Sequence, residues 1–216
     1  MNFEYACFIS YRHLKGDMKS FVDKFYDRLS EKLSFVVQND ELIFLDRNRM
    51  EVGDIVDEEI ADALSKSCCM IVIYTKNYLS EDHPYCAREL ATMLNLESQR
   101  RKALGQPSLS LIIPVVISGE QGELPSVISD RKYSTDFIFA RIIGTQNFKK
   151  KHERKFEKAI QKIANRVETL LDTTKNYDVS DLENYKLLDV SDERVMELFA
   201  KEILAAKPED DRPYPK

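Results

Sequence analysis

Glu89 is the residue whose surroundings in the sequence most suggest chemistry. On a helix that advances about 100° per residue, Glu89 falls within an apolar arc that also holds Cys86, Leu90 and Met93. A carboxylate there is costly unless it is paired, neutralised or beside a cavity, and such carboxylates are common at functional sites. The other interpretation is a carboxylate in the first helical turn, where the helix dipole favours negative charge. Periodicity alone favours neither interpretation.

A second glutamate in the same apolar arc means that the arc alone does not identify a site residue. Glu97 falls within the same arc, so the pattern is not unique to Glu89. Glu97 stands close to the expected helix end near Gln99, where we expect the chain to leave the core. We therefore expect Glu97 to lie near solvent, whereas both interpretations of Glu89 stay open on the pattern alone.

Three polar segments are expected to lie near Glu89. They follow the first three strand-like runs and comprise residues 10–13, 46–53 and 75–85. Because the carboxyl ends of parallel strands meet at one edge of an open sheet, ligands collect at that edge. The chain has six glycines and contains neither a G-x-G-x-x-G nor a P-loop sequence. A nucleotide would therefore have to be bound by a motif other than these two.

Hydrophobic periodicity predicts the elements that position these segments. Continuous apolar runs typical of buried strands occupy residues 5–9, 42–45, 68–74, 109–117 and 137–140. Apolar residues at helical spacing predict helices over residues 18–33, 56–67, 84–99 and 156–171. Pro114 places its part of the fourth run at a sheet edge or a bulge. The alternation predicts an α/β fold with a doubly wound five-stranded parallel sheet of flavodoxin-like order.

The chain divides into a domain and an extension. We expect residues 1–171 to form the α/β domain and residues 172–216 to form a C-terminal helical extension with a disordered tail. Apolar residues at helical spacing predict one helix over 195–204, with Ser191 capping its start. We expect the extension to pack on the domain; it could instead block assembly or contact a partner.

Composition excludes several classes of protein. The 216 residues carry a net charge of −5 and are 43% hydrophobic, which suffices for a core. The short basic run at residues 149–151 is more typical of a solvated helix face than of a nucleic-acid site. No apolar run approaches the ~20 residues of a membrane span, and no signal peptide is expected. Four cysteines without a Cys-x-x-Cys pair, and three histidines, indicate reduced thiols, a cytoplasmic location and no metal site.

Four sequence boxes, in order and at matching spacing, resemble those of TIR (Toll/interleukin-1 receptor) domains. The boxes are Phe8-Ile9-Ser10-Tyr11-Arg12, then Phe44-Leu45-Asp46 with Glu51-Val52-Gly53, then residues 60–79 ending in Asn77-Tyr78-Leu79, and finally Tyr85-Cys86-Ala87-Arg88-Glu89-Leu90. The last box is similar to the family's W-C-x-x-E-L box, with tyrosine in place of tryptophan. The resemblance covers residues 5–90, and the chain to about residue 170 fits the same fold.

The resemblance implies a function through Glu89. Catalytic TIR domains hydrolyse NAD or rearrange it into cyclic or linear ADP-ribose signals, using the glutamate of the last box. By this resemblance the chain is an NAD glycohydrolase or ADP-ribosyl cyclase of bacterial anti-phage immunity, as in Thoeris systems. NAD is then the substrate, and no cofactor is expected. Nicotinamide leaves as a neutral group, and a nearby carboxylate stabilises the oxocarbenium character that ribose acquires.

The same resemblance implies a set of substrate-binding residues. They are Phe8, Ser10, Tyr11, Arg12, Asp46, Glu51, Gly53, Tyr85 and Cys86. Arg12 would lie near the diphosphate, although a surface salt bridge explains it equally well. Gly53 could instead be a loop glycine that needs a positive φ. Tyr85 keeps an aromatic wall but adds a hydroxyl group.

The implied partners follow from the same family. They are other TIR protomers, whose loops help complete the pocket, and a separate effector reached through a nucleotide signal; neither nucleic acid nor a membrane is expected. The alternative function is a non-catalytic TIR scaffold, or a mimic of host TIR proteins, that acts only through TIR–TIR assembly. A third is a TIR-like nucleoside transferase, which would also use a glutamate at this edge.

Overall fold

In the part of the chain that the structure describes, a four-stranded parallel sheet forms the centre of the molecule. The computed structural model describes residues 3–12, 17–37, 42–45, 56–79, 84–119, 124–178 and 186–188. The strands are β1 (Tyr5–Tyr11), β2 (Ile43–Phe44), β3 (Ser67–Tyr74) and β4 (Ile112–Val116). All pair in parallel in the order β2-β1-β3-β4. Every strand residue is buried, which explains why the runs are continuously apolar, and the predicted flavodoxin-like order is confirmed for these strands.

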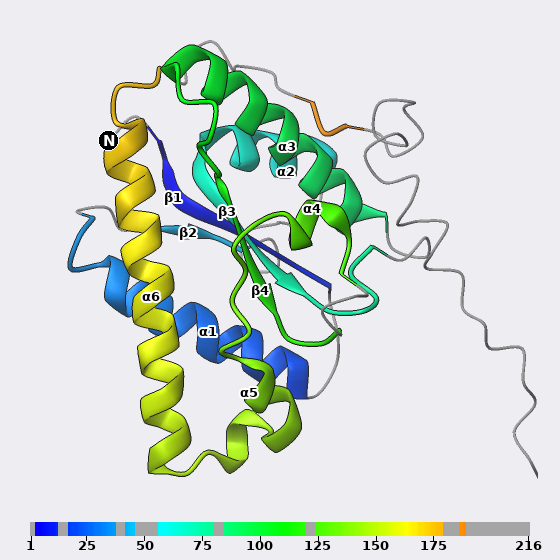
Figure 1. Cartoon of the computed structure of the whole chain (residues 1–216), viewed down its shortest axis with the longest axis vertical. Coiled ribbons are helices and arrows are strands. Elements are labelled where there is room, and N and C mark those ends of the chain that lie inside the picture. The colour runs from blue at the N-terminus through cyan, green and yellow to red at the C-terminus, as the bar shows by residue number, and fades with distance from the viewer. Residues whose placement is uncertain are drawn as a thin grey trace, which may run out of the picture.

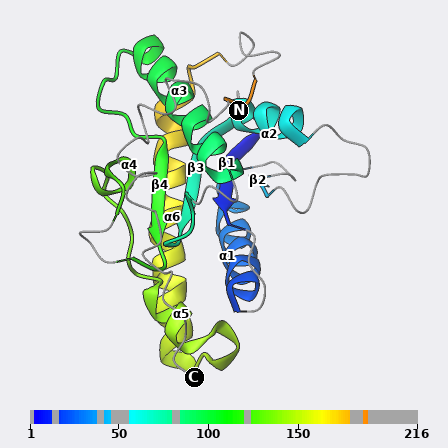
Figure 2. The ribbon, with the colours of Figure 1, turned by 90° about the vertical axis from the view of Figure 1, so that its right-hand side faces the viewer.

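Helices cover both faces of this sheet. The longer ones are α1 (Asp17–Leu33), α2 (Val56–Lys66), α3 (Tyr85–Leu104) and α6 (Lys150–Thr174), and the short ones are α4 (Ser126–Ser129), α5 (Ile138–Ile143) and η3 (Thr145–Asn147). α1 packs against α6, and α2 packs against α3 (Figure 1). In Figure 2, α3 lies in front of the sheet and α6 behind it. The doubly wound arrangement is therefore confirmed.

The expected last strand over residues 137–140 is wrong. Phe137 precedes α5, and Ile138–Ile143 form that helix. The Phe137 ring is fully buried and meets Phe25 and Phe156 edge-on, with ring centroids 5.4 and 5.3 Å apart. Burial explains the apolar run, because a short apolar run has the same pattern in a buried helix as in a buried strand.

An isolated β-bridge occupies the outer side of β4 instead. Ser134 bridges in parallel to Val115. Its N–H donates to the Pro114 carbonyl at 2.9 Å, and its own carbonyl accepts the Val116 N–H at 2.8 Å. Pro114 has no N–H and stands in the edge strand of the sheet, as predicted.

The helix α3 is longer than its periodicity predicts. It runs beyond Gln99 to Leu104 and ends on Gly105. Gly105 has a φ of 63°, a left-handed conformation that glycine adopts without steric cost. The Gln106 N–H then donates to the Arg101 carbonyl at 3.0 Å, which satisfies one of the last carbonyls of the helix. In the second half of α3, Leu96, Glu97 and Arg100 are buried.

Part of the C-terminal extension returns to α3. The expected domain boundary after residue 171 falls within the last turn of α6, and residues 186–188 lie against α3 (Figure 1). The Leu188 N–H donates to Thr92 Oγ1 at 3.0 Å, its carbonyl accepts from Arg88 Nε at 3.2 Å, and Leu187 is buried. Ser191 and the helix expected over 195–204 lie outside the described residues.

No helix in the described part of the chain has the length and apolar character needed to span a membrane.

Candidate active site

The carboxyl end of β1 meets the first turns of α3 at Glu89. β1 ends at Tyr11, and α3 begins just after Pro84, a residue suited to a first helical turn. Glu89 is only 5% exposed, as its place in the apolar arc predicts. The hydroxyl of Ser10, itself 1% exposed, donates to Glu89 Oε2 at 2.5 Å. The first strand and the third helix are therefore joined at a buried carboxylate.

Tyr78 completes this cluster and was not among the predicted site residues. Its hydroxyl lies 2.5 Å from Ser10 Oγ, and its ring is fully buried. Burial raises the pKa of Tyr78 well above its ordinary value of 10; Cys86 and Glu89 raise it further, and the bond to Ser10 acts in the opposite direction. Tyr78 is therefore a neutral phenol at pH 7. Its place just beyond the carboxyl end of β3 is the sequence signal that could have found it.

Other residues of the first and last boxes surround this cluster or support it from the core. Cys86 is buried one turn before Glu89, on the side where it influences Tyr78. Phe8 packs within the core, with its ring stacked on Phe44 at 5.2 Å between centroids. Tyr11 is buried, and the alternation of side chains along a strand directs it to the other side of β1 from Ser10.

Arg12 reaches from the end of β1 to the segment after β3. Its Nη1 donates to the Asn77 carbonyl at 2.9 Å. Within the described residues its Nε atom has no hydrogen-bond partner, and neither has the buried Thr75 Oγ1. Buried polar atoms usually have partners. The carboxyl edge of the sheet therefore holds two buried polar atoms that the described chain leaves without a hydrogen bond.

Tyr85 lies on the outer side of the same helix start. Its side chain is 44% exposed, and the Arg88 guanidinium lies over its ring at 5.6 Å from the centroid. Arg88 also binds both carboxylate oxygens of Asp57 in α2, at 3.1 and 2.8 Å. Arg88 therefore links α3 to α2.

The predicted site residues Asp46, Glu51 and Gly53 lie outside the described residues. Their roles stay predictions.

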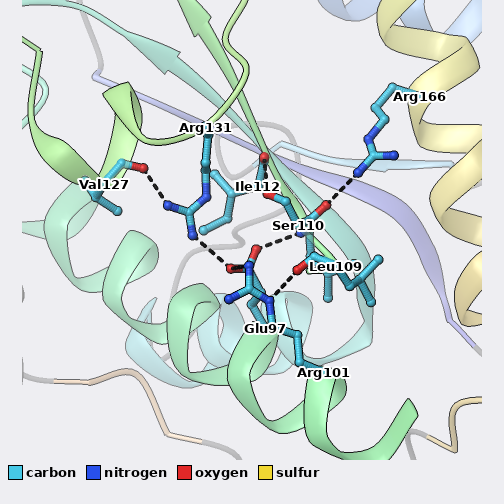
Figure 3. Close-up of polar contacts among 9 residues, drawn as sticks. Glu97, Arg101, Leu109, Ser110, Ile112, Val127, Arg131 and Arg166 are labelled. Atoms are coloured by element: carbon cyan, nitrogen blue, oxygen red, sulfur yellow. Dashed lines mark hydrogen bonds and ion pairs between the residues drawn. The ribbon is translucent and has the colours of Figure 1, made fainter. Parts of the chain in front are cut away.

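The expectation that Glu97 lies near solvent is wrong. Glu97 is 1% exposed and forms ion pairs with Arg101 at 2.6 Å and Arg131 at 2.8 Å. Its Oε2 atom accepts the Leu111 N–H at 2.7 Å. Figure 3 shows Glu97 between the two arginines, which also bind the carbonyls of Leu109 and Val127. The carboxylate ties α3 to Leu111, just before β4, and to Arg131 after α4, so its role is structural.

The comparison with known families decides the family. A model of the TIR domain matches residues 7–164, which is most of the chain. The chain belongs to the TIR domain family. The matched segment includes Ser10, Tyr78 and Glu89, whereas residues 186–188 of this TIR protein lie beyond it.

Comparisons with individual proteins give less evidence on the family than the family model does. No curated protein matches the TIR chain. Among solved structures, it is similar to a chain described as the TIR domains of the activated Roq1 resistosome directly recognizing the pathogen effector XopQ. The two are 19% identical with a TM-score of 0.41, over 90% of this chain and 97% of that one. We assign the family on the match of the family model alone.

Proposed function

We propose that this TIR domain cleaves the nicotinamide–ribose bond of NAD with Glu89 as its catalytic carboxylate. The products are ADP-ribose or a cyclic or linear ADP-ribose signal. The observation that carries the proposal is the buried Glu89 carboxylate, which the Ser10 hydroxyl holds at the carboxyl edge of β1. Glu89 also occupies the position of the glutamate that catalytic relatives use. NAD enters as substrate, so the reaction needs no resident cofactor.

The chemistry requires only one carboxylate. Nicotinamide departs as a neutral base and takes the electron pair of the C1′–N bond, which leaves positive charge on the ribose. A fixed carboxylate beside C1′ stabilises that charge, and its effect is stronger in a buried site than in water. Water then adds to C1′ and releases one proton, which gives ADP-ribose. A nucleophilic atom of the same molecule gives the cyclic product instead.

The neighbouring polar groups supply contacts for the rest of the substrate. We assign Arg12 to the diphosphate, because a guanidinium matches phosphate oxygens and its Nε is unsatisfied within the described residues. Asp46, Glu51 and Gly53 are assigned to the pocket by the family resemblance. On the same basis, the active form is an assembly of TIR protomers that acts in bacterial anti-phage immunity, and its product activates a separate effector.

The test is a product analysis with matched variants. Concentrated protein, or protein forced to assemble, is incubated with NAD, and the products are resolved by chromatography and mass spectrometry. The wild type and Glu168→Gln, which changes an exposed glutamate of α6, should consume NAD. Glu89→Gln should not. The product mass distinguishes hydrolysis from cyclisation and from transfer to another acceptor.

Two results would contradict the proposal. One is intact NAD after incubation with assembled wild-type protein; in that case the TIR domain is a non-catalytic scaffold. The other is equal activity in Glu89→Gln, which would remove Glu89 from the chemistry.

A further inference from the structure

We propose that Tyr78 is a positioning residue that holds the Glu89 carboxylate in place through the Ser10 hydroxyl. The three side chains form a directed chain of hydrogen bonds that runs from phenol to hydroxyl to carboxylate. The catalytic effect of this hydrogen-bond chain rests on the proposed function, whereas the geometry of the hydrogen bonds does not.

The direction of the chain follows from the proton of Ser10. A serine hydroxyl has one proton, and an ionised carboxylate can only accept. Ser10 donates that proton to Glu89 Oε2 at 2.5 Å. In its second hydrogen bond, also 2.5 Å long, Ser10 must therefore accept, and Tyr78 must donate.

The burial of Tyr78 makes this direction stable. Its side chain is fully buried, and burial raises its pKa well above 10, so the phenol keeps its proton over the physiological range. A buried O–H without an acceptor is costly, so the Tyr78 hydroxyl binds Ser10 Oγ. Within the described residues, the titratable groups that face Tyr78 are Glu89 and Cys86 on α3 and Tyr74 on β3, whose ring centroid lies 5.9 Å from that of Tyr78. With its oxygen bound to Tyr78, the Ser10 hydroxyl directs its own proton to Glu89.

Three separate segments therefore fix one carboxylate. Ser10 comes from β1, Tyr78 from the turn after β3, and Glu89 from α3. Electrostatic stabilisation of a transition state depends on charges that are already in place before the reaction. Loss of the Tyr78 hydroxyl removes the hydrogen bond that orients Ser10 and so weakens the hold of Ser10 on the carboxylate. This change should lower kcat for NAD more than it raises KM.

The first test is a double-mutant cycle with Tyr78→Phe and Ser10→Ala. Each single change should lower kcat about tenfold, the rate equivalent of one hydrogen bond to a charged group. Because Tyr78 acts through Ser10, Tyr78→Phe should have no further effect in the Ser10→Ala background. Tyr5→Phe is the matched control, since it removes another largely buried phenol hydroxyl, bonded to Glu4 at the other end of β1. It should leave kcat unchanged.

The second test reads the carboxylate directly and needs no NAD. The Glu89 carboxyl carbon is followed by ¹³C NMR over pH and assigned by its absence in Glu89→Gln. A hydrogen bond to the ionised form favours ionisation, so Tyr78→Phe and Ser10→Ala should each raise the titration midpoint, by about one pH unit. Tyr5→Phe should not change it. If Tyr78→Phe fails to fold, Ser10→Ala tests the same hydrogen-bond chain from the β1 side.

The two tests separate the two proposals. If wild-type protein leaves NAD intact, the proposed function fails, and the NMR titration still tests the hydrogen-bond chain. An unchanged midpoint in Tyr78→Phe or in Ser10→Ala would overturn the chain. Multiplicative losses of kcat in the double variant would also overturn it, because they would show that the Tyr78 hydroxyl acts independently of Ser10.

Discussion

The two buried glutamates of α3 differ in what holds them. Glu97 lies between Arg101 and Arg131 and accepts a backbone N–H, so its charge is balanced by structural partners. Glu89 accepts from the Ser10 hydroxyl at the edge where strands end. In the proposed reaction, the negative charge of Glu89 would stabilise a cationic transition state.

The structural role of Glu97 gives a prediction. Glu97→Gln leaves both arginines without their anion and should lower the free energy of unfolding by about 3 kcal/mol, at the low end for a broken buried pair because Arg101 is a third exposed. Urea denaturation measures this loss. The same change at an exposed glutamate of α6, Glu168→Gln, should stay within about 0.5 kcal/mol of wild type. Equal stability of the two variants would show that the ion pairs contribute little.

The site could be predicted from sequence only in part, for reasons visible at single residues. Glu89 and Ser10 stand in boxes that the family shares, and helical spacing already placed Glu89 among apolar neighbours. Tyr78 was missed because its partner Ser10 is 68 residues away in the chain, so only the fold brings the hydroxyls together. Glu97 was misjudged because α3 continues past its predicted end to a glycine cap.

At the scale of elements, continuous apolar runs predicted the four strands because parallel strands are buried on both faces. The same signal failed at residues 137–140. There the aromatic cluster of α1, α5 and α6 buries Phe137 as fully as any strand residue. A continuous apolar run therefore predicts that a segment is internal. Whether that segment forms a strand or a helix depends on the neighbouring elements.

The central strands also carry buried thiols, which gives a pH prediction. Burial raises the pKa of Cys7 in β1 far above its ordinary value, whereas in the unfolded chain the thiol ionises at about pH 8.5. A group whose pKa is higher in the folded protein than in the unfolded chain stabilises the folded state fully at pH values below the unfolded pKa. This contribution falls as the pH rises above the unfolded pKa. The melting temperature should therefore fall from about pH 8.5 upward. Cys7→Ala should lower the melting temperature overall but reduce this pH dependence; an unchanged dependence would contradict the prediction.

At the scale of the whole molecule, the C-terminal extension contacts the helix that carries Glu89. Leu187 is buried and Leu188 binds Arg88 and Thr92, residues on either side of Glu89 in α3. The TIR family model ends at residue 164, so this contact is an addition to the shared domain. The sequence predicted that the extension packs on the domain, and residues 186–188 do so.

Removal of this segment gives the third prediction. A chain that ends at residue 178 keeps Tyr177 stacked on Phe3 but loses the burial of Leu187. Burial of a leucine less the entropy of ordering its segment leaves about 1 kcal/mol, which corresponds to a fall of roughly 2–4 °C in melting temperature. Differential scanning calorimetry measures it. A truncated chain that keeps its melting temperature and gains constitutive activity would show that the extension blocks assembly instead.

The most direct test of the central claim is the rate of nicotinamide release from NAD by assembled wild-type protein and by Glu89→Gln. The amide keeps the shape of the side chain and can still accept from Ser10, so folding should be preserved and only the charge is lost. We predict a rate about 10²–10³-fold lower in Glu89→Gln, with an unchanged melting temperature. Equal rates in the two proteins would contradict the account.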